Sequence, residues 1–220
     1  MIRRPPRSTP SNSSAASDVY KRQIDNMGIE MTEDRIHFIE KHIVDISNVD
    51  LKGRILDIGG GGEGIIGQYK GNSVIAIDRL KSELEEAPDG GYLKIIMDAQ
   101  DLKFLDDAFD TVTAFYMFMY VSLELRAKIF EEIFRVLRPG GEFMIWDMVI
   151  TEKGDNKKEF YGAGVEVNIG EKVIETGYAT RWNKTQDLEH FSKLGEKVGF
   201  QIMEKDVNKK RIFVRFQKPR

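Results

Sequence analysis

Short apolar runs rich in Ile and Val alternate with amphipathic segments along most of the chain. Runs of this kind, bounded by Gly, Asn or Asp, are typical of parallel strands buried on both faces. We predict five of them, at RILDIG (54–59), SVIAID (73–78), YLKIIMD (92–98), DTVTAFYMFMYV (110–121) and EFMIWDMV (142–149). Between the last two, LRAKIFEEIFRVL (125–137) has the apolar spacing of a helix that ends at Arg138-Pro139-Gly140-Gly141. Alternating strands and helices predict an α/β fold with a doubly wound sheet.

The segment before the first run also has helical spacing. In MTEDRIHFIEKHIVDI (31–46), apolar residues recur at Ile36, Ile39, Ile43 and Ile46. Thr32 precedes two acids, as an N-cap residue does, and Met31 is placed to pack on Ile36. We therefore expect an amphipathic helix here.

The C-terminal part departs from simple alternation. TQDLEHFSKLGEKVGF (185–200) predicts a helix capped by Thr185 and ended near Gly199. The strands FQIMEKDV (200–207) and RIFVRFQK (211–218) are too close together for a crossover, so they must be antiparallel and the sheet ends with one reversed strand. The long connection at about 151–184 contains a predicted hairpin over the carboxyl ends of the sheet. It would act as a lid or substrate wall, or else be a surface hairpin without a role.

Composition limits the class of protein. A chain of 220 residues with 41% hydrophobic residues can bury one core, and we expect a single domain over 24–220. Residues 1–23 are rich in Arg, Ser and Pro, so we expect them to be disordered; they resemble a translated sequencing adapter, with an organelle transit peptide as the alternative. Without them the chain has a net charge of −7, which disfavours nucleic acid as a general partner.

The content of a few residue types excludes several kinds of site. There is no cysteine, so disulfides, thiolate metal sites and a cysteine nucleophile are excluded, and a reducing cytoplasm is expected. Three histidines make a histidine-based metal site improbable, and we predict no metal. The apolar stretch Val112–Val121 is about half of the roughly 20 residues that span a bilayer, so no membrane anchor is expected.

A glycine-rich turn follows the first predicted strand. Gly59, Gly61 and Gly64 fit the G-x-G-x-x-G pattern between a strand and a helix, while Gly60, Gly62 and Gly67 are expected to be less constrained. Glycines in this context let the backbone approach a bound nucleotide or nucleoside closely; a flexible turn is the alternative.

Two acids at strand ends narrow the ligand. Asp78 ends the second strand about 20 residues beyond the glycine turn, where a carboxylate can accept hydrogen bonds from a ribose diol. Asp98 ends the third strand at the same crevice, although either acid could simply face water at a strand end. Together with the glycines they favour a ligand that contains a ribose and an adenine.

With these pieces in place, the chain resembles the class I S-adenosylmethionine-dependent methyltransferases. The resemblance rests on LDIGGGGEG, on Asp78, on DAQDLKF with the following FD, and on LRPGGEF, and it extends from about residue 31 to 217. It implies a Rossmann-like sheet of seven strands in the order 3-2-1-4-5-7-6, with helices on both faces. Many family members have a glycine where this chain has Glu63, so the template should fit worst there. The resemblance implies that the cofactor S-adenosyl-L-methionine is bound by Asp57, Gly59, Gly60, Gly61, Gly64, Asp78, Arg79, Asp98, Ala99 and Phe115.

Methyl transfer from a sulfonium needs the methyl donor and the acceptor to be aligned, water to be excluded and an acceptor proton to be removed. It needs no covalent nucleophile of the protein. The candidate bases are Asp147 and Tyr116, with His190 a further possibility if the fold brings it close. The fourth strand lacks the Asn/Asp-Pro-Pro-Tyr/Phe sequence of the family's adenine and glutamine N-methylating members, which favours a small-molecule acceptor. A non-catalytic S-adenosylmethionine-binding protein, an RNA methyltransferase and an NAD-dependent oxidoreductase are the alternatives. The oligomeric state is not indicated.

Overall fold

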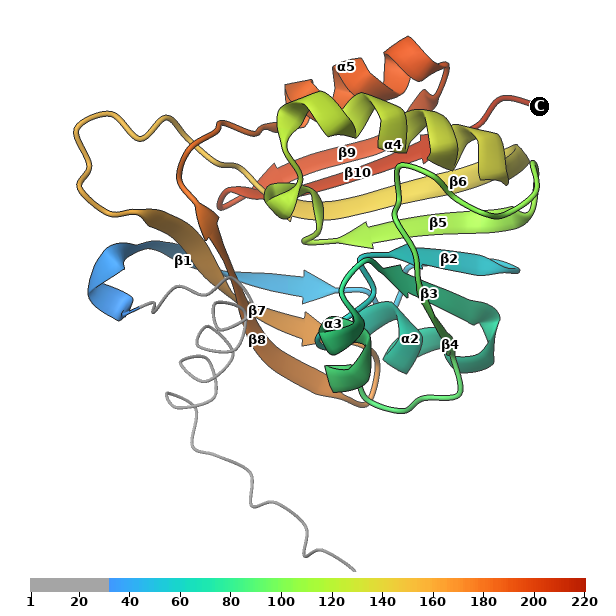
Figure 1. Cartoon of the computed structure of the whole chain (residues 1–220), viewed down its shortest axis with the longest axis horizontal. Coiled ribbons are helices and arrows are strands. Elements are labelled where there is room, and N and C mark those ends of the chain that lie inside the picture. Colours follow the sequence, from blue (N-terminus) through green and yellow to red (C-terminus); the bar gives the residue numbers. More distant parts are fainter. Residues whose placement is uncertain (1–31) are drawn as a thin grey trace, which may run out of the picture.

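Residues 32–220 are described by a computed structural model and form two β-sheets, with helices on both faces of the larger one (Figure 1). The tail predicted at 1–23 and the packing of Met31 lie outside the described residues. Among residues 32–220, no helix is long and apolar enough to cross a membrane.

The larger sheet has seven strands in the spatial order β4-β3-β2-β5-β6-β10-β9. Numbered along the chain within this sheet, that order is 3-2-1-4-5-7-6, so the predicted doubly wound architecture is confirmed. β10 is antiparallel to both β6 and β9 and is the reversed strand. The strands are β2 (Ile55–Ile58), β3 (Val74–Asp78), β4 (Leu93–Ile96), β5 (Phe109–Phe115), β6 (Leu137–Met148), β9 (Gln201–Asn208) and β10 (Arg211–Gln217).

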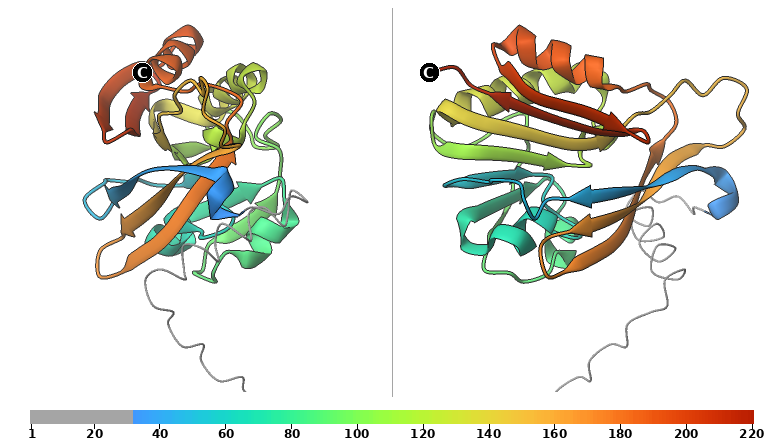
Figure 2. Two further views of the ribbon diagram at one scale, coloured as in Figure 1. Left: turned by 90° about the vertical axis from the view of Figure 1, so that its left-hand side faces the viewer. Right: turned by 180° about the vertical axis from the view of Figure 1, so that it is seen from behind.

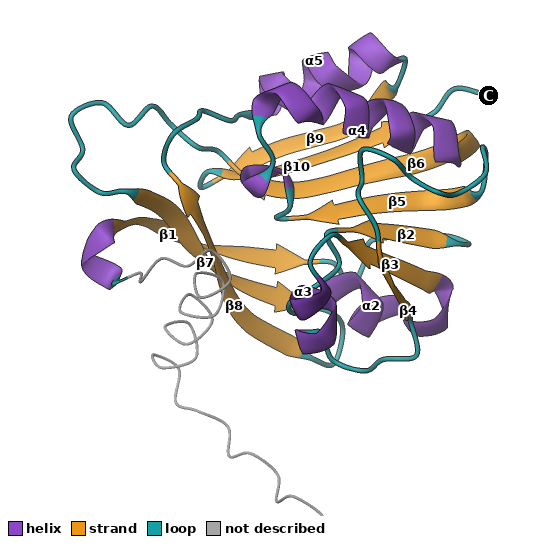
Figure 3. Ribbon diagram, in the orientation of Figure 1, coloured by secondary structure: helices purple, strands orange, loops and turns teal. Residues whose placement is uncertain are grey.

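Helices cover the two faces of this sheet (Figure 3). On one face α4 (Leu123–Val136) and α5 (Leu188–Val198) bury residues such as Phe130 and Phe191 against β5, β6 and β10. α5 is capped by the side chain of Asp187, which accepts a hydrogen bond from His190 N at 2.8 Å, so the predicted cap Thr185 is wrong by two residues. The opposite side carries α2 (Ile65–Lys70) and α3 (Lys81–Glu86), and three 3₁₀ helices complete the described part: η1 (Glu33–Arg35), η2 (Gly71–Ser73) and η3 (Phe118–Tyr120).

A second sheet of three strands lies across from α4 and α5, on the α2 side of the large sheet (Figure 2). It consists of β1 (Ile36–Asp45), β7 (Phe160–Asn168) and β8 (Val173–Arg181) in the order β1-β7-β8. β7 and β8 form an antiparallel hairpin within the long connection, and β1 pairs parallel with β7. The connection and the N-terminal segment therefore build one layer together.

The helix predicted at 31–46 is wrong, because this segment forms β1. His42, Val44 and Ile46 are buried with the period of two that a strand requires, whereas Ile43, assigned to the apolar face of the expected helix, is 67% exposed. The partner that decides the outcome, β7, lies more than a hundred residues away in the sequence, and only the 3₁₀ turn η1 remains of the helical start. Pairing between distant strands overrides local spacing here.

The fourth predicted strand is shorter than expected. β5 ends at Phe115 because Tyr116 has a φ of +50°, in the left-handed region that interrupts a strand. The rest of the apolar run turns into η3. Tyr116 thus stands at the carboxyl end of the sheet.

Candidate functional site

The glycine turn connects β2 to α2 and lies against the end of β3. The backbone N–H groups of Gly59 and Gly60 both donate to the carbonyl oxygen of Ile77, at 2.8 and 3.1 Å. Gly59 has a φ of +71° and Gly64, which precedes α2, a φ of +55°. Residues with a side chain rarely adopt this backbone conformation, so the turn needs glycine at both positions.

The other glycines of the turn are more constrained than the sequence indicated. A Cβ atom on Gly60 would lie 2.6 Å from Asp57 Oδ2, and one on Gly67 would lie 2.6 Å from the ring of Tyr92. Gly62 has a φ of +58°. The expectation that these three glycines are less constrained is wrong, because neighbouring side chains leave no room for a Cβ atom on Gly60 or Gly67 and the positive φ favours glycine at position 62.

Asp57, in β2, is buried beneath the turn with 2% of its surface exposed. Its Oδ1 accepts a hydrogen bond from Thr113 Oγ1 at 2.7 Å. Burial, to which the charge of Asp78 adds, raises the pKa of Asp57 to about 7 although the bond from Thr113 opposes this. A cationic group bound nearby would favour the ionised form.

Asp78 ends β3 beside the glycine turn. Its Oδ1 accepts from Leu80 N at 2.9 Å, and burial raises its pKa. A Cβ on Gly61 would lie 3.1 Å from Asp78 Oδ2 and 2.4 Å from Glu83 Cβ, so any side chain at Gly61 would occupy the space next to this carboxylate. Glycine is therefore needed at position 61 because Glu83 of α3 packs against the turn, and Arg79 is exposed next to Asp78.

Asp98 lies two residues beyond β4, exposed at the same edge of the sheet. Its Oδ1 accepts from the backbone N–H of Gln100 at 2.9 Å, which fixes the carboxylate and turns the chain. Ala99 is partly buried and packs against the core on the α4 side. The ends of β2, β3 and β4 therefore present a glycine turn and two acids side by side, as parallel pairing of the strands requires.

Tyr116 is buried at the end of β5, and its hydroxyl lies 2.7 Å from His42 Nδ1. His42 Nε2 faces the carbonyl oxygen of Lys209 at 3.2 Å. Because a carbonyl can only accept, Nε2 carries the hydrogen and Nδ1 is the acceptor for the Tyr116 hydroxyl. Burial lowers the pKa of His42 to about 4, so its ring is neutral at physiological pH.

The pairing of His42 with Tyr116 was missed by reasoning from sequence. His42 was assigned to a helix, and only the strand β1 brings it to the end of β5. His42, Val44 and Ile46 are buried at every second position, and this period of two is the signal that could have indicated a strand.

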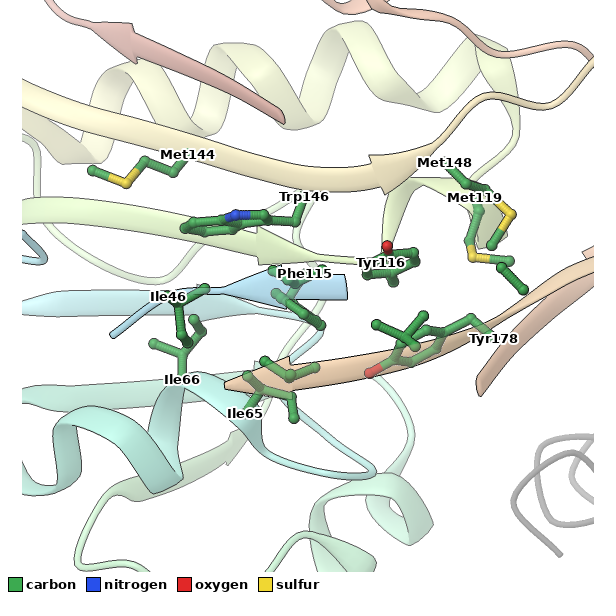
Figure 4. Close-up of a cluster of buried hydrophobic side chains, with 14 of the residues drawn as sticks. Ile46, Ile65, Ile66, Phe115, Tyr116, Met119, Met144, Trp146, Met148 and Tyr178 are labelled. Carbon is green, nitrogen blue, oxygen red and sulfur yellow. The ribbon is translucent and has the colours of Figure 1, made fainter. Parts of the chain in front are cut away.

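Aromatic side chains from both sheets meet at Tyr116 (Figure 4). Tyr178 of β8 stacks on Tyr116 with ring centroids 4.7 Å apart and an angle of 14° between the planes. Phe115 contacts Tyr116, Tyr178 and Trp146, at centroid distances of 5.1, 6.3 and 5.9 Å. The second sheet thus encloses the end of β5 on the side of the crevice.

Glu63, inside the glycine turn, is also bound by β8. Its Oε1 accepts from Thr176 Oγ1 at 2.7 Å and its Oε2 from Tyr178 OH at 3.2 Å. Burial raises the pKa of Glu63. The misfit expected at this position is therefore a contact to the second sheet, which sequence alone did not indicate.

Asp147 lies on the other face of β6 from this cluster. Its neighbours Trp146 and Met148 pack with Tyr116, whereas Asp147 is fully buried towards α4. It accepts hydrogen bonds from Met119 N at 3.2 Å, Met148 N at 2.8 Å and Gln186 Nε2 at 2.8 Å. Burial raises its pKa to about 6, while the charge of Arg126 lowers it.

His190, the further candidate base, lies in the first turn of α5 near the charge of Arg126, and burial lowers its pKa. Of the three candidates, the structure brings only Tyr116 into ring contact with Phe115 and the second sheet.

Comparison with known proteins agrees with this geometry. Residues 56–145, which run from β2 to β6, match the family model of the methyltransferase domain. This match covers less than half of the chain. The predicted fold is confirmed by the strand order of the large sheet and by the solved structures described below.

Two curated relatives match parts of this chain. A phosphoethanolamine N-methyltransferase of Plasmodium falciparum is 30% identical over 171 residues, which are 66% of this chain and 64% of the relative. A sterol 4-C-methyltransferase of Caenorhabditis elegans is 38% identical over 69 residues, 30% of this chain and 20% of the relative. The chain therefore spans less than two thirds of either protein.

Solved structures show the same fold at low identity. A S-adenosylmethionine-dependent methyltransferase from Methanosarcina mazei superimposes with a TM-score of 0.57 at 22% identity, covering 77% of this chain and 94% of that one. One from Mesorhizobium loti gives a TM-score of 0.54 at 17% identity, covering 75% and 90% of the two chains.

Proposed function

We propose that this chain transfers a methyl group from S-adenosylmethionine to a small-molecule acceptor, and that Tyr116 and His42 take up the acceptor's proton. The observation that carries the proposal is the bond from the Tyr116 hydroxyl to the neutral His42 at the end of β5. Names of the two curated relatives support a small molecule as the acceptor.

The proton path follows from the hydrogen bonds. An acceptor N–H or O–H that donates to Tyr116 Oη would lose its proton to that oxygen, while the phenol proton passes to His42 Nδ1 across 2.7 Å. Nε2–H stays on the carbonyl of Lys209, which fixes the ring. The methyl group would come from S-adenosylmethionine held in the crevice, with the neutral thioether as the leaving group. Enclosure of Tyr116 by the second sheet excludes water from the transfer.

We assign the cofactor to the crevice at the ends of β2, β3 and β4. Asp57 and the glycine turn, Gly59, Gly60, Gly61 and Gly64, would hold the methionine part, and Phe115 would face the sulfonium. Asp78, with Arg79 beside it, would bind the ribose hydroxyls, and Asp98 with Ala99 the adenine edge. The glycine turn and the two acids lie at neighbouring strand ends of the same sheet edge, which supports this assignment.

We favour an amine as the acceptor. The phosphoethanolamine relative aligns with 66% of this chain and the sterol relative with 30%, and an amine has the proton that Tyr116 is placed to accept. Asp147 and His190 receive no part in proton removal, because Asp147 already accepts three hydrogen bonds and His190 lies in α5 near Arg126.

The test has two steps. First, S-adenosylhomocysteine should raise the melting temperature of the chain, by the equivalent of about 2.7 kcal/mol at 100 times Kd, and NADH should not. Asp78→Ala should remove most of that shift, and a shift with NADH alone would indicate an oxidoreductase instead.

Second, labelled methyl groups should pass from the cofactor to small amines, with alcohols and RNA as parallel acceptors. Labelling of RNA alone would contradict the small-molecule proposal. Cofactor binding without transfer to any fraction of a cell extract would indicate a non-catalytic binding protein.

A further inference from the structure

Three inward residues of β8 connect the second sheet to successive parts of the site. Thr176, Tyr178 and Thr180 are two positions apart, so they point to the same face of the strand. Thr176 Oγ1 donates to Glu63 in the glycine turn, and Thr180 Oγ1 donates to the carbonyl of Met119 in η3 at 2.9 Å. Between them, Tyr178 contacts both Glu63 and Tyr116. One strand face therefore spans the distance from the cofactor turn to the segment that follows Tyr116.

Glu63 is the residue through which the turn reaches this face. The family resemblance implies glycine at this position in many members, and a glycine has no side chain that could make this contact. Both carboxylate oxygens are bound by β8, and the backbone carbonyl of Glu63 accepts from Gln68 Nε2 at 2.6 Å at the start of α2. The backbone of Glu63 is thus held by α2, and its side chain is held by the second sheet.

The stacked rings extend the connection to the proposed proton acceptor. Tyr178 donates its hydroxyl hydrogen to Glu63 and stacks its ring on Tyr116, with the planes 14° apart. The rings of Tyr178 and Tyr116 lie next to each other in Figure 4. Tyr116 in turn donates to His42 of β1, which is itself a strand of the second sheet. A shift of the glycine turn that moves Glu63 must therefore move Tyr178 against Tyr116, or break one of these contacts.

We infer that Glu63 is a positioning residue that couples cofactor binding in the glycine turn to the placement of Tyr116 through β8. The inference rests on the proposed function, because it gives Tyr116 its role. A turn ordered by bound cofactor holds Glu63, Glu63 holds β8, and β8 sets the ring against which Tyr116 stacks. Coupling is reciprocal, so closure of the second sheet also favours the cofactor-bound turn.

The test measures three quantities separately: cofactor affinity, turnover, and the protection of β8 from hydrogen exchange. In the wild-type chain, S-adenosylhomocysteine should slow hydrogen exchange in both the glycine turn and Val173–Arg181. In Glu63→Ala, the Kd should rise because the coupling is reciprocal, but far less than in Asp78→Ala, while kcat falls at least tenfold and the added protection of β8 disappears.

Two further variants separate coupling from structure. Glu63→Gln keeps an acceptor for Thr176 and a partner for Tyr178, so it should retain kcat within about threefold and keep the protection. Glu86→Ala, at an exposed residue of α3 whose charge acts on Glu63, removes a nearby acid without touching β8 and serves as the matched control. It should behave as the wild type.

The outcomes distinguish this inference from the proposed function. Unchanged kcat and unchanged β8 protection in Glu63→Ala, or a loss of cofactor binding as large as in Asp78→Ala, would overturn the coupling. A wild-type chain that gains β8 protection with S-adenosylhomocysteine but transfers no methyl group would contradict the proposed activity and leave the coupling supported.

Discussion

Tyr116 and His42, which are 74 residues apart in the chain, share a buried hydrogen bond of 2.7 Å between the phenol oxygen and Nδ1. Each comes from a different sheet, so the bond exists only when the second sheet lies on the end of β5. The backbone of Tyr116 is held as well, since its N–H donates to the carbonyl of Trp146 at 2.7 Å.

Removing either partner of this pair should slow methyl transfer. Tyr116→Phe and His42→Gln should each lower kcat by about 10²–10⁴-fold, the range for a positioned general base, and leave the Kd of S-adenosylhomocysteine within about threefold. The double variant should lose little more than the worse single variant, because the two residues act as a unit. The control is Tyr69→Phe in α2, which removes a hydroxyl group that donates to Ser47 O. Additive losses in the double variant would show that the pair does not share one proton.

The depressed pKa of His42 predicts a loss of stability in acid. Its pKa is about 4 in the folded chain and about 6.5 when unfolded, so the unfolded state binds more protons between these values. Stability should therefore fall as pH is lowered from about 6.5 to 4, by up to about 3 kcal/mol from this group. Urea unfolding at pH 7 and pH 4.5 should show the drop, and His42→Gln should reduce it. An identical drop in that variant would assign the acid sensitivity to other groups.

The raised pKa of Asp57 predicts the opposite change of stability with pH. Its folded pKa of about 7 is above the unfolded value of 3.8, so the stability linked to its protonation is present below pH 4 and lost as pH rises through 7. Asp57→Asn should therefore gain stability relative to the wild type on going from pH 5 to pH 8. In the wild type, a cationic cofactor should bind more tightly at pH 8 than at pH 6 and release protons on binding at pH 6. Calorimetry in buffers of different ionisation enthalpy measures that release, and a pH-independent affinity would argue against a cofactor near Asp57.

The large sheet was predictable because its signals are local. Runs such as VIAID and LDIG are apolar on both faces and end in Gly or Asp, and each forms a strand by pairing with a neighbour of the same kind. The glycine turn and Asp78 follow these strands directly, so their placement at one edge also follows from the sequence.

The second sheet could not be predicted in this way. β1 has three Ile residues at helical spacing, and its strand conformation depends on β7, whose position is set by the tertiary fold. For the same reason the sequence did not reveal that His42 meets Tyr116 or that Glu63 meets Thr176, since both contacts join the two sheets. The glycine turn and the strand-end acids were therefore accessible from the sequence, and the contacts between the two sheets were not.

The turn between β9 and β10 offers a test that separates backbone from side chain. Lys209 and Lys210 have φ values of +51° and +66°, a conformation that costs roughly 1–2 kcal/mol per residue for a residue with a Cβ atom. Two-residue hairpin turns with two positive φ values favour Asn-Gly. The double variant Lys209→Asn, Lys210→Gly should therefore raise the free energy of unfolding by about 1–2 kcal/mol in urea. The carbonyl of residue 209, which fixes His42 Nε2, is part of the main chain and stays in place, so kcat should change little. A more stable variant with a large loss of kcat would show that the Lys210 ammonium, 3.3 Å from Tyr161 OH, contacts the acceptor.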